Sequence, residues 1–188
     1  MTKDLISENY RAQNAELHQR NRKYGASGHE WENRVVGYLK DMKKEVGVSS
    51  YLDYGCGKGQ LADLVAARCV KWAGFGVSRY DPVTNPKLPA PADFVTCCDV
   101  LEHIEPELLD NVLEHLASLM LVGGLLVISL RKSGKVLADG RNAHLIVENK
   151  EWWYSRLSKF FAEMHEVDPI RPKRVTTELA MLVKPRRG

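Results

Sequence analysis

The stretch Leu52-Asp53-Tyr54-Gly55-Cys56-Gly57-Lys58-Gly59 decides the fold of this chain of 188 residues. It begins in a short run of strand-forming residues, 50–54, and it leads into the helical spacing of apolar residues in 61–69. Glycine accepts a positive φ without steric cost and lets a ligand approach the backbone closely. A strand, a glycine turn and the start of a helix in this order therefore predict a ligand site at the helix N-terminus.

Two common phosphate-binding patterns do not fit this turn. A P-loop requires GxxxxGK[ST], but Lys58 is followed by Gly59. A dinucleotide site requires GxGxxG, and Gln60 stands where the third glycine would be. A tight turn that binds no ligand also remains open on this evidence.

The rest of the chain alternates between strand and helix patterns. Strands are expected at 50–54, 73–78, 94–98, 125–130, near Val167 and at 179–183, and helices at 1–23, 29–46, 61–69, 106–116 and 149–164. Gly123-Gly124 is expected to end the fourth helix before the next strand begins. The alternation predicts an α/β sheet with helices on both faces, and the last two strands are expected to form an antiparallel pair.

Composition restricts the class of protein. The formal net charge is +3, with 44% apolar and 27% charged residues, as in an ordinary globular domain. No apolar run is long enough for a membrane span and the start has no signal-peptide layout, so we expect a cytoplasmic protein without a membrane partner. The four cysteines have no CxxC spacing, so neither disulfides nor a metal site are expected. The weak net charge argues against a nucleic-acid partner.

A second motif, Asp99-Val100-Leu101-Glu102-His103-Ile104, follows the strand at 94–98. Together with the Asp-x-Gly-x-Gly-x-Gly of 53–59 it resembles the class I S-adenosylmethionine (SAM)-dependent methyltransferases, in particular their small-molecule type 11 branch. Gly123-Gly124 and the apolar run after it resemble the entrance to the family's fifth strand, and His144 before an apolar pair matches its C-terminal third. The resemblance covers about residues 48–183.

This resemblance implies an architecture. It is a Rossmann-like three-layer sandwich with a mostly parallel sheet and an antiparallel C-terminal strand. Residues 1–47 would form a helical lid and residues 48–188 the SAM-binding core. The chain departs from the family at 82–92, where four prolines in eleven residues leave no room for a helix and a strand. We therefore expect a sheet truncated between the family's second and fourth strands, with six strands instead of seven.

The resemblance also assigns roles to residues. The turn residues Gly55, Cys56, Gly57 and Gly59 would pass the methionine part of the cofactor, Asp53 would orient it, Asp81 would accept hydrogen bonds from the ribose, Asp99 would form a wall of the adenine pocket, and Tyr24 would close over the cofactor from the loop 24–28. His103 and His144 are candidate general bases. Asp81-Pro82 as a simple turn, and the two histidines as packing or capping residues, stay open as alternatives.

The expected function is methyl transfer from SAM to an oxygen or nitrogen atom of a small-molecule, sugar or nucleotide-linked acceptor, with S-adenosylhomocysteine as the product. Acceptor specificity is assigned to the loops 24–28 and 131–144, since polar loops on the ligand side of such sheets carry it. The alternatives are an RNA methyltransferase and a SAM-binding module without turnover. A homodimer is compatible with the sequence.

Overall fold

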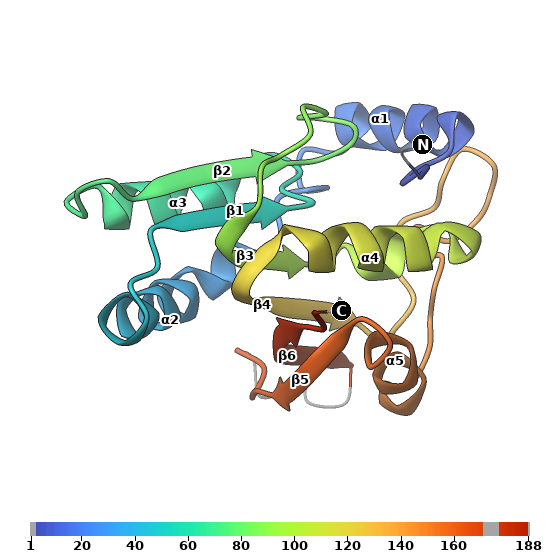
Figure 1. Cartoon of the computed structure of the whole chain (residues 1–188). Coiled ribbons are helices and arrows are strands. Elements are labelled where there is room, and N and C mark those ends of the chain that lie inside the picture. Colours follow the sequence, from blue (N-terminus) through green and yellow to red (C-terminus); the bar gives the residue numbers. More distant parts are fainter. Residues whose placement is uncertain (1–2, 171–176, 188) are drawn as a thin grey trace.

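The computed structural model describes residues 3–170 and 177–187 of the chain. Within these residues six strands form one sheet in the order β2-β1-β3-β4-β6-β5 (Figure 1). The strands are β1 (Ser50–Tyr54), β2 (Gly76–Tyr80), β3 (Ala92–Cys98), β4 (Met120–Ser129), β5 (Phe161–Glu166) and β6 (Glu178–Pro185). The neighbouring pairs among the first four strands are parallel, and β6 is antiparallel to both β4 and β5. The predicted mostly parallel sheet with an antiparallel C-terminal pair is confirmed.

Helices cover both faces of this sheet. The α-helices are α1 (Glu8–Arg20), α2 (Glu32–Glu45), α3 (Gln60–Cys69), α4 (Leu109–Leu119) and α5 (Lys150–Leu157). One apolar cluster joins α2 and α3 to one face of the sheet, and a second joins α4 and α5 to the other. α1 lies near the end of the sheet toward which β1 and β3 point (Figure 1). No helix in the described part of the chain is long and apolar enough to cross a membrane.

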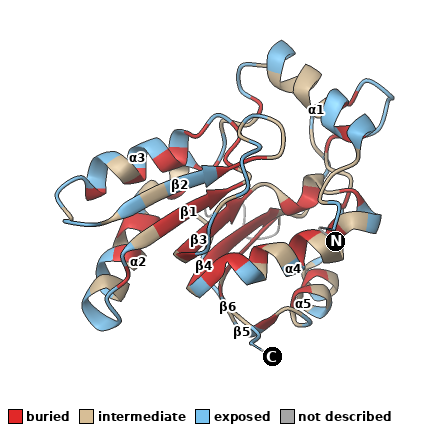
Figure 2. Ribbon diagram, turned by 45° about the horizontal axis from the view of Figure 1, so that its top comes forward, coloured by how far each residue is buried: buried red, intermediate tan, exposed pale blue. Residues whose placement is uncertain are grey.

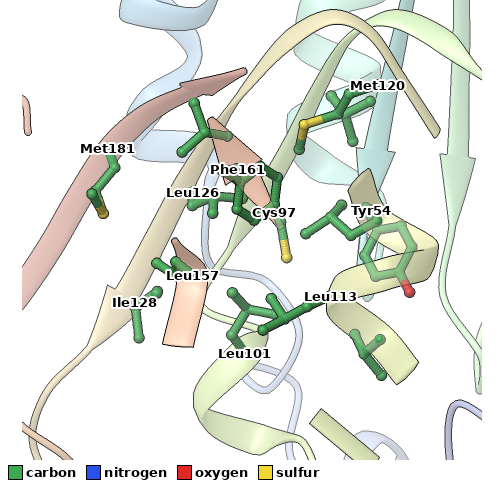
Figure 3. Packing of buried hydrophobic residues seen from close by; sticks show 14 of the residues in the cluster. Tyr54, Cys97, Leu101, Leu113, Met120, Leu126, Ile128, Leu157, Phe161 and Met181 are labelled. Atoms are coloured by element: carbon green, nitrogen blue, oxygen red, sulfur yellow. The ribbon is translucent and has the colours of Figure 1, made fainter. Parts of the chain in front are cut away.

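The core lies along the central strands, which are buried over most of their length (Figure 2). On the side of α4 and α5, Leu113, Leu126 and Leu157 are fully buried and belong to one cluster (Figure 3). Strands of a parallel sheet that are covered on both faces are near-continuously apolar. β3 fits this pattern, since six of its seven residues are buried and Thr96 is its one buried polar residue. The continuous apolar run at 94–98 therefore occupies the centre of the molecule, as its sequence predicted.

The edge at β2 shows the expected truncation. The segment from Asp81 to Pro91 forms no helix, and its one bridge is a turn in which Asp81 and Asn85 exchange both backbone hydrogen bonds, 3.1 and 3.0 Å long. Because no further strand pairs with it, β2 is the edge of the sheet, and most of its residues are exposed or half-buried. Its position is 76–80, shifted from the predicted 73–78.

Two further predicted boundaries are wrong. The helix expected at 149–164 ends at Leu157, and β5 starts at Phe161. Phe161 still packs in the same cluster as Leu157, so the apolar spacing is real, but it spans a helix and a strand. Gly123 and Gly124 lie inside β4, which begins directly after α4, and not in a break before the strand.

Gly124 is predicted to be sensitive to substitution because a Cβ there would lie 2.4 Å from the carbonyl oxygen of Val95 on β3. Gly124→Ala should lower the free energy of unfolding by about 1–3 kcal/mol, as overpacking of a core does. Gly76→Ala is the matched control, since it is also a strand glycine and a Cβ there would meet nothing within 4 Å. Urea unfolding followed by circular dichroism measures both, and equal stabilities of the two variants would contradict the role of this close approach.

Candidate active site

A cavity of about 330 Å³ lies at the carboxyl ends of the parallel strands. Its floor includes residues that end or follow each strand: Tyr54 and Gly55 after β1, Tyr80 and Asp81 after β2, Asp99 after β3, and Ser129 and Arg131 after β4. Tyr10, Asn14 and His18 of α1 line the same cavity. Open α/β sheets bind their ligands at this edge, and the volume falls in the range of small-molecule sites.

The structure brings most of the predicted site residues to this cavity. The members that line it are Tyr24, Gly55, Gly57, Asp81, Asp99, His103 and His144. Asp53, Cys56 and Gly59 do not belong to the lining. The thiol of Cys56 is buried, and burial raises its pKa to about 12, so it stays protonated at neutral pH.

The glycine turn is attached directly to the loop 24–28. Gly57 has a φ of +51°, and a Cβ there would lie 2.4 Å from the carbonyl oxygen of Gly25. The same carbonyl accepts a 2.7 Å hydrogen bond from the backbone N–H of Lys58, whose ammonium group donates to the carbonyls of Asn21 and Arg22 at 3.1 and 2.6 Å. The absence of a side chain at Gly57 therefore lets the loop close over the turn.

Asp53 is buried beneath the start of α3 and accepts a 3.3 Å hydrogen bond from Thr96 on β3. Burial raises the pKa of this carboxyl to about 6, although the Thr96 hydroxyl and the backbone N–H of Ala62 act in the opposite direction. Because Ala62 belongs to the first turn of α3, Asp53 connects β1, β3 and this helix.

Asp81 has both a structural and a cavity-facing position. Its Oδ1 accepts hydrogen bonds from the N–H groups of Val83 and Thr84 at 2.8 and 2.9 Å, the pattern of an Asx turn. Its Oδ2 accepts from the N–H of Gly57 at 3.1 Å. The predicted Asp-Pro turn and the predicted place in the site are therefore one arrangement, in which the carboxylate joins the end of β2 to the glycine turn.

Asp99 follows β3 in a left-handed conformation, with a φ of +55°. Asp tolerates this region better than most residues, but it is uncommon outside glycine. The backbone N–H of Asp99 donates to the carbonyl of Val127 on β4 at 2.9 Å. Val100 packs against Gly55, where a Cβ would lie 2.3 Å from its side chain.

His103 and His144 lie side by side, with ring centroids 4.7 Å apart and planes at 84°. Nδ1 of His103 is 2.7 Å from the carbonyl oxygen of Ala143, and Nδ1 of His144 is 2.6 Å from that of Arg131. A carbonyl oxygen can only accept, so each Nδ1 carries the proton and each Nε2 keeps its lone pair. Burial, with His144 as the next cause, lowers the pKa of His103 to about 3, and burial also lowers the pKa of His144.

Glu102 was not among the site residues predicted from the sequence. It is fully buried and lines the cavity beside the two histidines. Its Oε1 accepts a 3.0 Å hydrogen bond from the N–H of Ser129, while its Oε2 has no hydrogen-bond partner among the described residues. Burial raises the pKa of this carboxyl well above its usual value, and the charge of Asp99 adds to the effect.

The residues of α1 were missed as well. The sequence predicted a helix at 1–23 within the lid 1–47 but singled out none of its residues for the site, yet Tyr10, Asn14 and His18 all line the cavity. They recur at intervals of four residues, which places them on one face of a helix. That spacing was the available signal. His18 Nδ1 is a buried atom with no hydrogen-bond partner in the described part of the chain, as expected at a site for a polar ligand.

Residues 8–167 of the chain match the model of the family described as "Methyltransferase domain". This match extends over most of the chain, so the protein belongs to this family. Together with the Rossmann-like sheet and the glycine turn, it makes the chain a class I SAM-dependent methyltransferase. Comparison with the sequences of curated proteins gave no match.

Solved structures share the fold at low sequence identity. A 1,6-didemethyltoxoflavin-N1-methyltransferase of Burkholderia thailandensis, with 1,6-didemethyltoxoflavin and S-adenosylhomocysteine bound, is 16% identical with a TM-score of 0.58 over 100% of this chain and 94% of that one. The N-methyltransferase NodS of Bradyrhizobium japonicum, in complex with S-adenosylhomocysteine, is 15% identical with a TM-score of 0.52 over 93% of this chain and 100% of its own. A SAM-dependent methyltransferase of Clostridium acetobutylicum is 13% identical with a TM-score of 0.55, covering 82% of this chain and 90% of that one.

The buried carboxyl of Asp53 should make stability depend on pH. Between pH of about 4 and 6 the unfolded chain loses the Asp53 proton before the folded chain does, so the free energy of unfolding falls as pH rises. The contribution reaches about 3 kcal/mol above pH 6. Asp53→Asn should remove this decrease, whereas Asp41→Asn on the exposed face of α2 should keep it. Urea unfolding at pH 4.5 and 7.5 measures the difference, and parallel profiles for the wild type and Asp53→Asn would contradict it.

Proposed function

We propose that this protein transfers the methyl group of SAM to an oxygen or nitrogen atom of a small-molecule acceptor bound in the cavity. The observation that carries this proposal is the position of the cavity, between the glycine turn and α1 at the carboxyl ends of the strands. In this proposal α1 and the loop 24–28 act as the lid over the bound molecules. The core beneath them supplies the glycine turn and the acidic residues.

The residues of the cavity fit the cofactor. The backbone at Gly55 and Gly57 is free of side chains, Oδ2 of Asp81 retains one lone pair for a ribose hydroxyl, and Asp99 stands at the end of β3 beside the space for the base. SAM carries a net positive charge through its sulfonium and amino groups, which suits acidic walls. When bound, it supplies a methyl carbon that is already activated for attack by its positively charged sulfur.

The charge of the cavity favours a small acceptor over RNA. Five carboxyl groups and three basic side chains line it: Asp81, Asp99, Glu102, Glu105 and Glu178 against Lys23, Arg131 and Lys135. Proteins that bind RNA neutralise phosphates with a surplus of basic side chains. In addition, α1 contributes to the walls of the cavity, and a volume of about 330 Å³ suits a compact molecule better than an extended strand.

His103 and His144 are proposed to orient the acceptor through their Nε2 atoms. Both rings are held in one tautomer by a carbonyl oxygen at Nδ1, so the lone pairs are in place before the acceptor arrives. Positioning of this kind supplies a large part of the rate enhancement when the electrophile is already reactive.

Asp81→Asn should weaken the binding of S-adenosylhomocysteine. The amide has one acceptor oxygen where the carboxylate has two, and it lacks the charge that strengthens the bond from a ribose hydroxyl to Oδ2. The loss of about 1.5–3 kcal/mol for a charged hydrogen bond corresponds to a dissociation constant about 10–150 times higher. Isothermal titration calorimetry measures the dissociation constant, and Asp41→Asn is the control that should bind as the wild type does.

Three results would decide against the proposal. The absence of heat with S-adenosylhomocysteine, for folded wild-type protein, would refute the cofactor site. Binding without methyl transfer to any of a broad panel of hydroxyl and amine acceptors would favour a SAM-binding module. Methylation of RNA, with an affinity that falls steeply as salt is added, would favour the RNA methyltransferase.

A further inference from the structure

Glu102, His103 and His144 come together from two separate segments. Glu102 and His103 belong to the short 3-10 turn 101–103 after β3, and His144 belongs to the loop after β4. Each of the three offers one ligand atom, and these atoms all lie within 4.8 Å of one another. Two imidazoles and one carboxylate at this spacing form a donor set for a divalent transition-metal ion.

The histidines are oriented as metal ligands are. In protein metal sites the ligating imidazole donates its other N–H to a carboxylate, a carbonyl or water, which fixes the tautomer and the direction of the ring. His103 and His144 both donate Nδ1–H to a backbone carbonyl, at 2.7 and 2.6 Å. In both rings this hydrogen bond leaves the lone pair on Nε2, where it can bind a metal ion.

Glu102 supplies the second, independent sign of a ligand. Its Oε2 is fully buried and has no hydrogen-bond partner in the residues that the structure describes. An unpartnered buried carboxylate oxygen is costly, and such atoms are rare in folded proteins. A cation beside this oxygen would remove the cost, since Oε1 already has its partner in Ser129.

The loop that carries His144 is tied to the Glu102 segment. The backbone N–H of Ile146 donates to the carbonyl of Glu102 at 3.0 Å, and the N–H of Ala143 donates to the carbonyl of Lys135 at 3.0 Å. The side chain of Asn142 accepts from the N–H of His144 at 3.0 Å. These contacts hold the three ligand groups close together in the folded chain, as an effective metal site requires.

The surrounding charges favour a cation at Glu102. Asp99 and Glu178 act on Glu102 as like charges. Against these stand Arg131 and Lys135, whose charges act on His144, that of Lys135 also on His103. A divalent ion between Glu102 and the histidines carries two positive charges. It would therefore offset the repulsion among Asp99, Glu102 and Glu178 more strongly than one basic side chain could.

We propose that Glu102, His103 and His144 bind one divalent transition-metal ion whose remaining coordination positions face the cavity. The sequence did not predict a metal site, because that prediction considered only the spacing of the cysteines. Three protein ligands of the His₂Glu type with an open position are the arrangement of catalytic zinc sites, whereas magnesium and calcium prefer oxygen ligands.

This site would also restrict the acceptor, a consequence that rests on the proposed function. An ion at this place would bind a hydroxyl or carboxyl oxygen of the acceptor and hold it in the cavity that we assign to methyl transfer. The two histidines would then orient the acceptor through the ion, and the acceptor would belong to the class of molecules with a ligating oxygen.

The experiment uses the full chain after treatment with EDTA and dialysis. Isothermal titration with ZnCl₂ is expected to show one ion per chain, and CoCl₂ should give the visible absorption bands of cobalt bound by nitrogen and oxygen ligands. His144→Gln and Glu102→Gln should each weaken zinc binding at least about tenfold. His165→Gln is the matched control, because this histidine lies exposed on β5 and should bind zinc as the wild type does.

Every variant is also titrated with S-adenosylhomocysteine and checked for folding by circular dichroism. Stoichiometric zinc binding that is lost in either folded variant supports the site. Absent zinc binding in wild-type protein that still binds S-adenosylhomocysteine overturns the metal site and leaves the proposed function standing. Unchanged zinc binding in both variants also overturns it, since the ion would then lie elsewhere, for example at the cysteines. Zinc binding without S-adenosylhomocysteine binding would refute only the proposed function.

Discussion

The parallel pairing of β3 between β1 and β4 is the constraint on which the rest of the structure depends. Because these strands run in one direction, each connection has to return across a face of the sheet, and helices therefore cover both faces. The same pairing places the carboxyl ends of all three strands along one edge. The glycine turn, Asp99 and the loop that carries His144 follow those ends, so the cavity is a consequence of the topology.

The truncated edge at β2 changes how the site is closed. The family pattern that the sequence resembles has a helix and a further strand after the position of Asp81, and these would extend the sheet. Here the segment 81–91 turns back, and Asp81 and Thr84 bond to the backbone of Gly57. On its other side the glycine turn is held by Gly25. The turn is thus fixed by contacts from two loops, one before it and one after it in the chain.

The succession of strands and helices along the chain and the place of the glycine turn could be predicted from the sequence because both depend on local patterns. The apolar run at 94–98 indicated the central strand, and the glycines of 55–59 indicated the turn that follows the neighbouring strand β1. The end of α5 could not be predicted in this way. Phe161 and Met164 continue the helical spacing of Trp153 and Leu157, and only pairing with the distant β6 makes their segment a strand.

Motif residues such as Gly55, Gly57 and Asp99 line the cavity as predicted, whereas Asp53, Cys56 and Gly59 of the glycine motif do not. Residues that distant contacts bring to the cavity could not be predicted in this way. The spacing of Tyr10, Asn14 and His18 places them on one face of α1, but only the folded structure shows that this face lines the cavity. Glu102 belongs to a motif, but its importance depends on a missing partner for Oε2, which only the folded structure shows.

Asp53 and Glu102 illustrate how two buried carboxyl groups can have different meanings. Asp53 accepts hydrogen bonds from the Thr96 hydroxyl and the N–H of Ala62. These bonds offset the free-energy cost of burying its carboxyl group, and Asp53 thereby links β1 to β3 and α3. Among the described residues Glu102 has a partner for one oxygen only, and its carboxyl group lies beside two imidazoles with available lone pairs. Burial alone would not distinguish them, because both are buried. Their hydrogen bonding distinguishes them. It indicates that an additional positive group is needed at Glu102 and not at Asp53, the acid of the glycine motif.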